Sequence, residues 1–454
     1  MPRSGGRSTT ERCSFCDKGK LEVEKLIQGG RPGIYICNTC VEICHSIIDE
    51  SKESEKAPPL YLDEIPTPRQ IVSELDDFII SQDMAKKVLA VAGHNHFKRL
   101  LPLSDDADDS VKIEKSNMLL LGPTGCGKTA LARAMATLLD VPFAIGDATT
   151  LTEAGYVGED VENLILKLVQ DADYNIERAQ QGIIFVDEID KVGRATANVS
   201  ITRDVSGEGV QQSLLKLIEG TVANVPPQGG RQHPEQQYLQ VDTTNILFIC
   251  AGTFTGIEHI IAKREDMAEG TVGGFSNRDL YDAESLKSRK EIMDKLQPED
   301  LIEFGMIPEL LGRLPVVAAL DPLDEGDLVR VLQEPRDALV KQYTKLFSLN
   351  DTRLRFTSDA LREIARLAIK RKTGARALRS ILEEVMLDVL YELPDHKGEL
   401  QEFVVNKAVV DHRTFAKGGK TLRKDETGKK EAGDKNETGK KEAVDNDQDH
   451  RKTA

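Results

Sequence analysis

The segment with the clearest chemical meaning runs from residue 122 to residue 129 and reads Gly-Pro-Thr-Gly-Cys-Gly-Lys-Thr. It matches the P-loop pattern in full, follows the apolar residues 118–121 and precedes a helical pattern over residues 130–139. Glycines let backbone N–H groups wrap phosphates, Lys128 can reach the β- and γ-phosphates, and the Thr129 hydroxyl can ligate Mg²⁺. The residues expected to hold ATP here are Gly122, Pro123, Thr124, Gly125, Cys126, Gly127, Lys128, Thr129 and Ala130.

Two adjacent carboxylates end another apolar run. Residues 183–186 are Ile-Ile-Phe-Val, and Asp187 and Glu188 follow directly. In a P-loop ATPase this pattern is a Walker B site, in which Asp187 helps to hold the metal and Glu188 orients and polarises the attacking water. Either acid alone would be a solvated turn residue. Together with the P-loop, the pair predicts a chain that hydrolyses ATP rather than only binding it.

Four cysteines near the N-terminus have the spacing of a metal site. Cys13 with Cys16 and Cys37 with Cys40 form two CxxC pairs, separated by residues 17–36. That spacing predicts tetrahedral ligation of Zn²⁺ by four thiolates. The apolar residues between the pairs are too few to fold without the metal. The nearby Cys44 is expected to be a non-ligand, because four thiolates already close the shell.

Composition excludes several classes of protein. The chain has 454 residues and a net charge of −16, so as a whole it would be repelled by a phosphate backbone, and no nucleic-acid partner is expected. No apolar run is long enough for a membrane span, and residues 1–12 do not resemble a signal peptide. Seven cysteines in such a chain fit free thiols and metal ligands better than a disulfide framework. We therefore expect a cytoplasmic protein.

The elements that must position these residues fall into several modules. Apolar runs that alternate with helical patterns predict an α/β fold, with a mostly parallel sheet covered on both faces. The pattern from residue 324 to residue 393 is helical throughout, and the low-complexity C-terminus cannot bury enough apolar surface to fold. The expected order is a treble-clef-like zinc module over 10–52, a linker over 53–68, a large ATPase domain over 69–319, a smaller α-rich domain over 320–415 and a disordered charged tail over 416–454.

This combination of motifs resembles the ClpX family of AAA+ protein unfoldases. A four-cysteine module followed by this ATPase core carries the resemblance, which runs from about residue 13 to about residue 411. Three further stretches match the family beyond the general ATPase motifs: residues 75–82 (Leu-Asp-Asp-Phe-Ile-Ile-Ser-Gln), 155–160 (Gly-Tyr-Val-Gly-Glu-Asp) and 203–212 (Arg-Asp-Val-Ser-Gly-Glu-Gly-Val-Gln-Gln). The resemblance implies a homohexameric ring that unfolds protein substrates and threads them into the chamber of a ClpP-type peptidase.

The resemblance also implies roles that spacing alone does not. Arg313 matches the arginine finger that reaches a neighbour's γ-phosphate, and Arg376 matches the sensor-2 arginine of the small domain. Ile79 and Ile80 match part of the adenine pocket, and Thr253 is a candidate for sensor 1. The zinc module is expected to dimerise and to dock tagged or unfolded substrates and adaptors.

Loops of the family supply the remaining roles. Tyr156 and Val157 match the pore loop that grips substrate, and Arg231 and His233 match a basic loop at the channel entrance. Gln232 stands between them where the family has lysine, so one positive charge is missing. Gly273, Gly274 and Phe275 stand where the family carries an Ile-Gly-Phe loop that docks the peptidase, so an apolar anchor is missing.

Two other classes of function stay open at this point. A branch-migration or clamp-loading ATPase shares the P-loop core, although the acidic composition and the pore tyrosine argue against it. A chaperone that never engages a peptidase would also fit, because the docking loop is altered.

Overall fold

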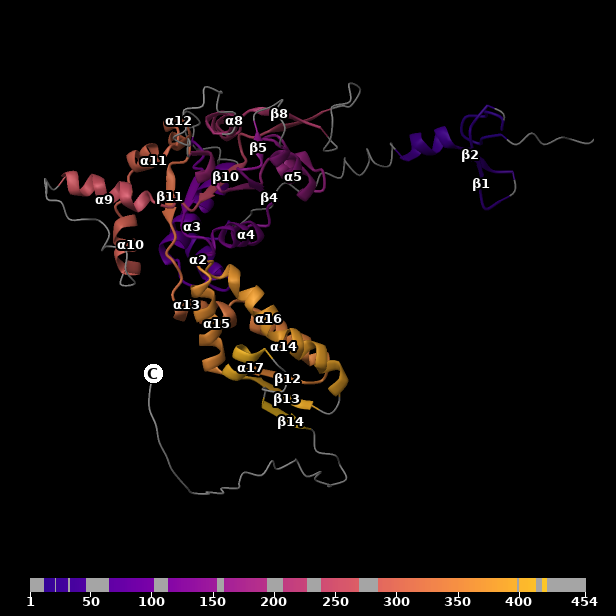
Figure 1. Cartoon of the computed structure of the whole chain (residues 1–454). Helices are drawn as coiled ribbons and strands as arrows, with labels where there is room; N and C mark the ends of the chain where they lie inside the picture. The colour runs from indigo at the N-terminus through magenta and orange to yellow at the C-terminus, as the bar shows by residue number, and fades with distance from the viewer. Residues whose placement is uncertain are drawn as a thin grey trace, which may run out of the picture. The chain divides into compact units, whose positions relative to one another are not determined.

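The computed structural model describes residues 12–20, 22–31, 33–45, 65–101, 113–152, 159–193, 207–226, 238–268, 285–397, 400–413 and 419–422 (Figure 1). The chain divides into two compact units. The first comprises residues 1–75, 83–122 and 128–320, and the second comprises residues 76–82, 123–127 and 321–454. Within the described ranges, no helix has both the length and the apolar composition needed to span a bilayer.

The N-terminal module is small and built around its cysteines. Strands β1 (Leu26–Gln28) and β2 (Tyr35–Cys37) form an antiparallel hairpin, and residues 38–45 are helical. Cys13, Cys37 and Cys40 are buried, and among the described residues of this module only Val23, Leu26 and Ile36 pack against them as partly buried apolar side chains. So small an apolar cluster supports the expectation that the fold depends on a bound metal.

The centre of the first unit is a five-stranded parallel sheet in the order β11-β3-β10-β7-β4. Its strands are β3 (Met118–Leu121), β4 (Phe143–Asp147), β7 (Ile183–Asp187), β10 (Leu247–Gly252) and β11 (Val316–Ala319). The three inner strands are buried along their apolar runs, as expected for a parallel sheet with helices on both faces. The predicted sheet is confirmed.

Helices and short strands surround this sheet. In chain order the helices are α2 (Pro68–Asp76), α3 (Asp83–Leu100), α4 (Lys128–Leu138), α5 (Asn163–Asp171), α6 (Ile176–Ala179), α7 (Ile189–Gly193), α8 (Glu208–Glu219), α9 (Ile257–Ala268), α10 (Ser285–Met293), α11 (Pro298–Phe304) and α12 (Pro308–Gly312). The short strands β5 (Leu151–Thr152) and β6 (Glu159–Asp160) pair in parallel, whereas β8 (Val222–Val225) and β9 (Leu239–Asp242) form an antiparallel pair. Helix α5 packs on β4, and α4 packs on β7 and β10.

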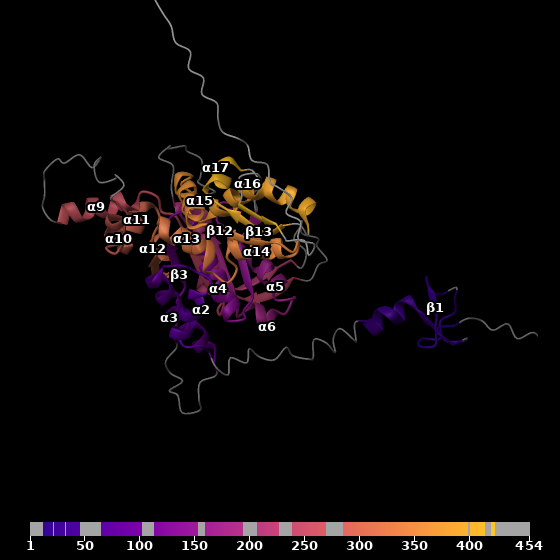
Figure 2. The same ribbon diagram turned by 90° about the horizontal axis from the view of Figure 1, so that it is seen from below.

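The second unit is helical but also contains a sheet (Figure 2). Its helices are α13 (Glu325–Gln333), α14 (Leu339–Ser348), α15 (Ser358–Lys370), α16 (Arg376–Glu392) and α17 (Lys407–His412), and a 3₁₀ turn, η2, spans Leu393–His396. Strands β12 (Arg353–Phe356), β13 (Leu400–Val405) and β14 (Gly419–Leu422) form the sheet, with β13 in the middle.

Two sequence-based expectations are corrected in this unit. Residues 324–393 are not helical throughout, because β12 lies between α14 and α15. The segment 416–454, expected to be disordered, contains four residues that form β14, paired antiparallel with β13. Strand β12 is only four residues long and alternates Arg with apolar residues, so its pattern is lost between two longer helical patterns.

Candidate functional site

The backbone of the P-loop turn adopts a conformation that favours glycine at two positions. Gly125 has a φ of +77° and Gly127 a φ of +106°, both in the left-handed region that disfavours side chains. The Cys126 N–H donates to the Pro123 carbonyl at 3.4 Å and closes the turn between them. Successive backbone N–H groups in such a turn make a concave anion site. The local geometry therefore suits the phosphate cradle that the motif predicts.

Residues 373–375 lie directly against this turn within the second unit. The Ala375 N–H donates to the Gly125 carbonyl at 3.1 Å. A methyl group on Gly125 would lie 2.2 Å from the Thr373 carbonyl oxygen, so no side chain fits there. Arg376, the candidate sensor-2 arginine, follows Ala375 at the start of α16 and is exposed. Arg376 is therefore the residue directly after the one whose N–H is bonded to the P-loop turn.

The lysine and threonine of the P-loop motif begin α4 in the first unit. Lys128 is buried, and its Nζ donates to the Gly122 carbonyl at 2.7 Å. The Thr129 hydroxyl donates to Asp187 Oδ2 at 3.2 Å. The hydroxyl and the carboxylate predicted to share a magnesium ion are therefore neighbours. Oxygen donors of this kind are the ligands that Mg²⁺ prefers, so the two residues fit the metal.

Glu188 occupies a strained backbone position after β7. Its φ of +57° is uncommon for a residue with a side chain, and its N–H donates to Asp187 Oδ1 at 2.9 Å. Such conformations cluster at active sites, where the surrounding structure holds them in place. The strain at Glu188 agrees with a role for this side chain in chemistry rather than in packing.

The neighbouring strand supplies a polar pair that sequence patterns did not reveal. Thr253 follows β10, and both its N–H and its hydroxyl donate to the carboxylate of Asp190, at 3.1 and 3.0 Å. Asp190 is 2% exposed and lies in α7, three residues after Asp187. Thr253 was a candidate for sensor 1, whereas Asp190 was not singled out. The only sequence signal for Asp190 was its place close after the Walker B pair.

The candidate arginine finger lies at the surface of the first unit. Arg313 follows α12, and its side chain, half exposed, forms an ion pair with Glu219 at 3.0 Å. Asn117 holds the Arg313 backbone by donating from Nδ2 to its carbonyl at 3.0 Å. In the second unit, the candidate adenine-pocket residues Ile79 and Ile80 are buried, and Ile79 lies beside Gly127.

Several predicted functional residues are not described by the structure. They are Tyr156 and Val157 of the pore loop, Arg231 and His233 of the entrance loop, and Gly273, Gly274 and Phe275 of the docking loop. All seven lie outside the described residues, so their roles stay predictions.

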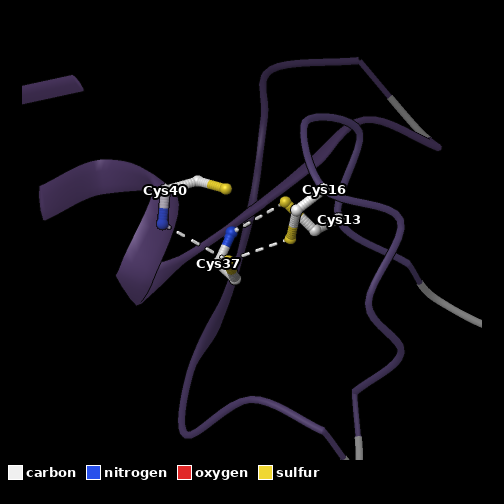
Figure 3. Close-up of side chains that lie close together, drawn as sticks. All are labelled: Cys13, Cys16, Cys37 and Cys40. Atoms are coloured by element: carbon white, nitrogen blue, oxygen red, sulfur yellow. Dashed lines mark hydrogen bonds between the residues drawn. The ribbon is translucent and has the colours of Figure 1, made fainter. Parts of the chain in front are cut away.

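The four predicted zinc ligands converge (Figure 3). The thiols of Cys13, Cys16, Cys37 and Cys40 all lie within 4.8 Å of one another. Backbone N–H groups of Cys37 and Cys40 donate to the sulfurs of Cys13 and Cys37 at 3.3 and 3.4 Å, which helps to orient those sulfurs. The two CxxC pairs are therefore folded together as a single cluster.

The acidity of these thiols differs within the cluster. Burial disfavours ionisation of Cys13, but N–H groups of Cys16, Phe15 and Cys37 outweigh it and lower the pKa of that thiol to about 6. Burial raises the pKa of Cys40, and hydrogen bonds that its S–H donates to the neighbouring cysteine sulfurs raise it further. A divalent cation would favour the thiolate form of all four, because zinc binding is coupled to loss of the thiol protons. The donor set fits zinc.

Comparison with protein families places three regions of the chain. Residues 11–50 match a ClpX C4-type zinc finger, residues 113–317 match an AAA domain of the Cdc48 subfamily, and residues 323–404 match the C-terminal D2-small domain of ClpB protein. The predicted resemblance to the ClpX family is confirmed. This ClpX-like chain is thus built from an AAA ATPase domain with a helical C-terminal region and an N-terminal Cys₄ zinc finger. ATP binding and zinc binding follow from these domains.

Proposed function

We propose that this ClpX-like chain is an ATP-dependent protein unfoldase and translocase, the ATPase and specificity component of a Clp-type protease. The observation that carries the proposal is the pairing of a ClpX-type zinc finger with an AAA domain in which the Thr129 hydroxyl and the Asp187 carboxylate lie 3.2 Å apart. An AAA domain alone would fit many motors. The ClpX-type zinc finger favours, among these motors, an ATPase that acts on proteins.

Each nucleotide-site residue has a part in this proposal. The N–H groups of the P-loop turn bind the phosphates, Lys128 leaves the Gly122 carbonyl for the β- and γ-phosphates, and Glu188 orients the attacking water. Thr129 and Asp187 would hold Mg²⁺, which neutralises charge on the phosphate oxygens when bound. Ile79 and Ile80 offer apolar surface to the adenine. Together these residues account for binding and hydrolysis by one chain.

Two arginines complete the proposed site. Arg376 contributes from the same chain, and Arg313 reaches the γ-phosphate held by the next subunit of a homohexameric ring. The Arg313 side chain pairs with Glu219 and is half exposed, so a neighbour could present its nucleotide to it. Its planar, permanently charged guanidinium suits a phosphate oxygen pair. Nucleotide turnover would therefore depend on assembly.

The loops do the mechanical work in this proposal. Tyr156 and Val157 grip a polypeptide in the channel, and Arg231 and His233 attract acidic tails at its entrance. The zinc module docks substrates and adaptors, and Gly273, Gly274 and Phe275 face a ClpP-type peptidase. The proposed setting is the cytoplasm, with no nucleic-acid or membrane partner. The domain boundaries given from the sequence are proposed with these roles.

The decisive experiment separates binding, hydrolysis and unfolding. Glu188→Gln should abolish steady-state ATP hydrolysis while nucleotide binding persists, because the amide cannot polarise the water. Tyr156→Ala should leave hydrolysis largely intact and slow the unfolding of a tagged fluorescent protein. Undiminished hydrolysis in the first variant would remove Glu188 from the mechanism, and an unchanged unfolding rate in the second would remove Tyr156.

A second candidate function is remodelling of proteins without a peptidase. It is favoured by Gly273, which stands where the family has an isoleucine whose burial would contribute about 1.5–3 kcal/mol to docking. The same fluorescent substrate distinguishes the two functions. Degradation on addition of a peptidase ring supports the protease role, whereas unfolding without degradation supports the chaperone role. Stimulation of hydrolysis by DNA instead of protein would contradict both.

A further inference from the structure

Gln82 uses its whole side-chain amide on backbone groups of the second unit. Its Nε2 donates to the Asp321 carbonyl at 2.7 Å and to the Cys126 carbonyl at 3.3 Å, and its Oε1 accepts from the Asp321 N–H at 2.8 Å. The residue is 5% exposed. Both amide hydrogens and the amide oxygen are therefore engaged, a pattern that neither a carboxylate nor an apolar side chain can reproduce.

The backbone at this position is held in an unfavourable conformation. Ser81 and Gln82 have φ values of +58° and +63°, so two successive residues with side chains occupy the left-handed region. Each such residue costs on the order of 1 kcal/mol and persists only where the surroundings hold it. Further hydrogen bonds anchor the short segment 76–82. The Asp77 carbonyl accepts from the Arg336 N–H at 2.8 Å, and the Ser81 hydroxyl donates to Asp327.

The two backbone partners of Gln82 have special places in the chain. Cys126 lies in the P-loop turn, one residue after the Gly125 carbonyl that accepts from Ala375. Asp321 is the first residue after Leu320, where the chain leaves the first unit for the last time and enters the second. Gln82 thus joins the phosphate-binding turn to the peptide that connects the two units.

We propose that Gln82 is a positioning residue that transmits displacement of the P-loop turn to the Asp321 peptide, so that the nucleotide state sets the relative orientation of the two units. The inference rests on the proposed ATP-driven function. It adds a mechanical coupling between the P-loop turn and the Asp321 peptide, which the Walker residues do not supply. When phosphates pull on the N–H side of the turn, the Cys126 carbonyl moves with it. The Gln82 amide carries that movement to Asp321 because it is bonded to both.

The test compares full-length Gln82→Met, Gln82→Glu and a matched control. Methionine keeps the volume and removes all three hydrogen bonds, whereas glutamate keeps only the acceptor for the Asp321 N–H. The control is Gln211→Met. Gln211 is 2% exposed, and its amide likewise makes three bonds to backbone groups, those of Val192, Gly305 and Ile307, within the first unit.

Three quantities are measured. The first is the distance between spin labels on bio-orthogonal residues at the exposed positions Glu177 in the first unit and Lys345 in the second, with ADP and with a non-hydrolysable ATP analogue. The second is the pair kcat and KM for ATP. The third is the thermal midpoint, which reports the structural cost of each substitution. Labels of this kind avoid the seven native cysteines.

For the wild type we expect a distance that changes with nucleotide. Gln82→Met should reduce this change to less than half, with a KM for ATP raised about tenfold, a factor equivalent to about 1.4 kcal/mol. Gln82→Glu should fall between wild type and Gln82→Met. Gln211→Met should lower the thermal midpoint as much as Gln82→Met does, yet keep the wild-type distance change.

Two results would overturn the inference. One is a full distance change in Gln82→Met, and the other is an equal loss in Gln211→Met, which would mean that any buried amide matters. Neither result touches the proposed function, because unfolding of a tagged substrate by the wild type is measured separately. If wild-type rings fail to unfold that substrate while the distance still follows nucleotide through Gln82, the proposed function fails and the inference stands.

Discussion

Replacing Gly125 by alanine would place a methyl group 2.2 Å from the Thr373 carbonyl oxygen and 3.0 Å from the Ala375 nitrogen. Real contacts of this kind are not shorter than about 3.0 Å, so the P-loop turn and residues 373–375 would have to separate by about 0.8 Å. The left-handed φ of +77° adds strain, on the order of 1–2 kcal/mol for any residue with a side chain.

The backbone strain and the steric displacement should affect different measured quantities. Strain of about 1–2 kcal/mol lowers the melting temperature of a domain this size by about 2–8 °C, so Gly125→Ala should still fold. A displacement approaching 1 Å of groups that position a reacting phosphate can cost about 100-fold in rate. We therefore expect kcat/KM for ATP to fall about 100-fold with only a modest loss of stability.

The assay is steady-state ATP hydrolysis beside a thermal melt, with Gly326→Ala as the control. Gly326 lies in α13 of the same unit, and a methyl group there would lie 3.2 Å from the Asp324 side chain, which needs to shift by only a few tenths of an ångström, so alanine should cost far less there than at Gly125. Wild-type kcat/KM in Gly125→Ala would refute the reasoning. Loss of activity only together with loss of the fold would refute it equally.

Further predictions concern the other polar features. Thr253→Val removes the hydroxyl's hydrogen bond to the buried Asp190 carboxylate but keeps the one from the backbone N–H, and it should lower the free energy of unfolding by about 1–3 kcal/mol in a denaturant titration. Burial, and next the charges of nearby cations, lower the pKa of His96 to about 3, so below pH 6.5 the unfolded chain binds a proton that the folded chain does not. Stability should therefore fall with decreasing pH, by about 2 kcal/mol at pH 5 from this residue. Cys37→Ser should abolish zinc binding and protease resistance of residues 12–45 while hydrolysis stays within about twofold. Arg313→Ala should lower ATP turnover about a thousandfold without weakening nucleotide binding.

Each of these predictions has a result that would contradict it, and the first has a matched control. Thr137→Val, which removes an exposed hydroxyl of α4, should cost little, and an equal cost would mean that Asp190 is not the reason. An identical pH slope in His96→Asn would contradict the buried-histidine argument. Stoichiometric zinc in Cys37→Ser, measured by elemental analysis, would remove that thiol from the ligands. Undiminished ATP hydrolysis by assembled rings of Arg313→Ala would exclude Arg313 as an arginine finger.

Local motifs could be predicted because their chemistry depends on spacing along the chain. The P-loop glycines and the adjacent acids Asp187 and Glu188 lie within short segments, and the parallel sheet follows from continuous apolar runs. The four cysteines were recognisable because each pair forms a local knuckle. Their convergence within 4.8 Å agrees with that reading.

Features that depend on distant partners could not be predicted in the same way. Gln82 and Asp321 are 239 residues apart in the chain, and nothing local marks their hydrogen bonds. Asp190 is bonded to Thr253 across 63 residues. The small sheet was missed because β12 is short and pairs with β13, whose residues follow it by about fifty positions. In each case tertiary structure decides which residue finds a partner.

Strand β14 has a practical consequence for anyone who shortens this chain. It covers one side of β13, whose other side is occupied by β12. Truncation before residue 419, an obvious choice for removing a charged C-terminus, would leave the N–H and C=O groups of β13 without their strand partner on that side. An uncovered strand edge is a template for pairing with another molecule. Truncation before residue 419 would therefore favour aggregation through β13, whereas ending the chain after residue 422 would keep that edge of β13 paired with β14.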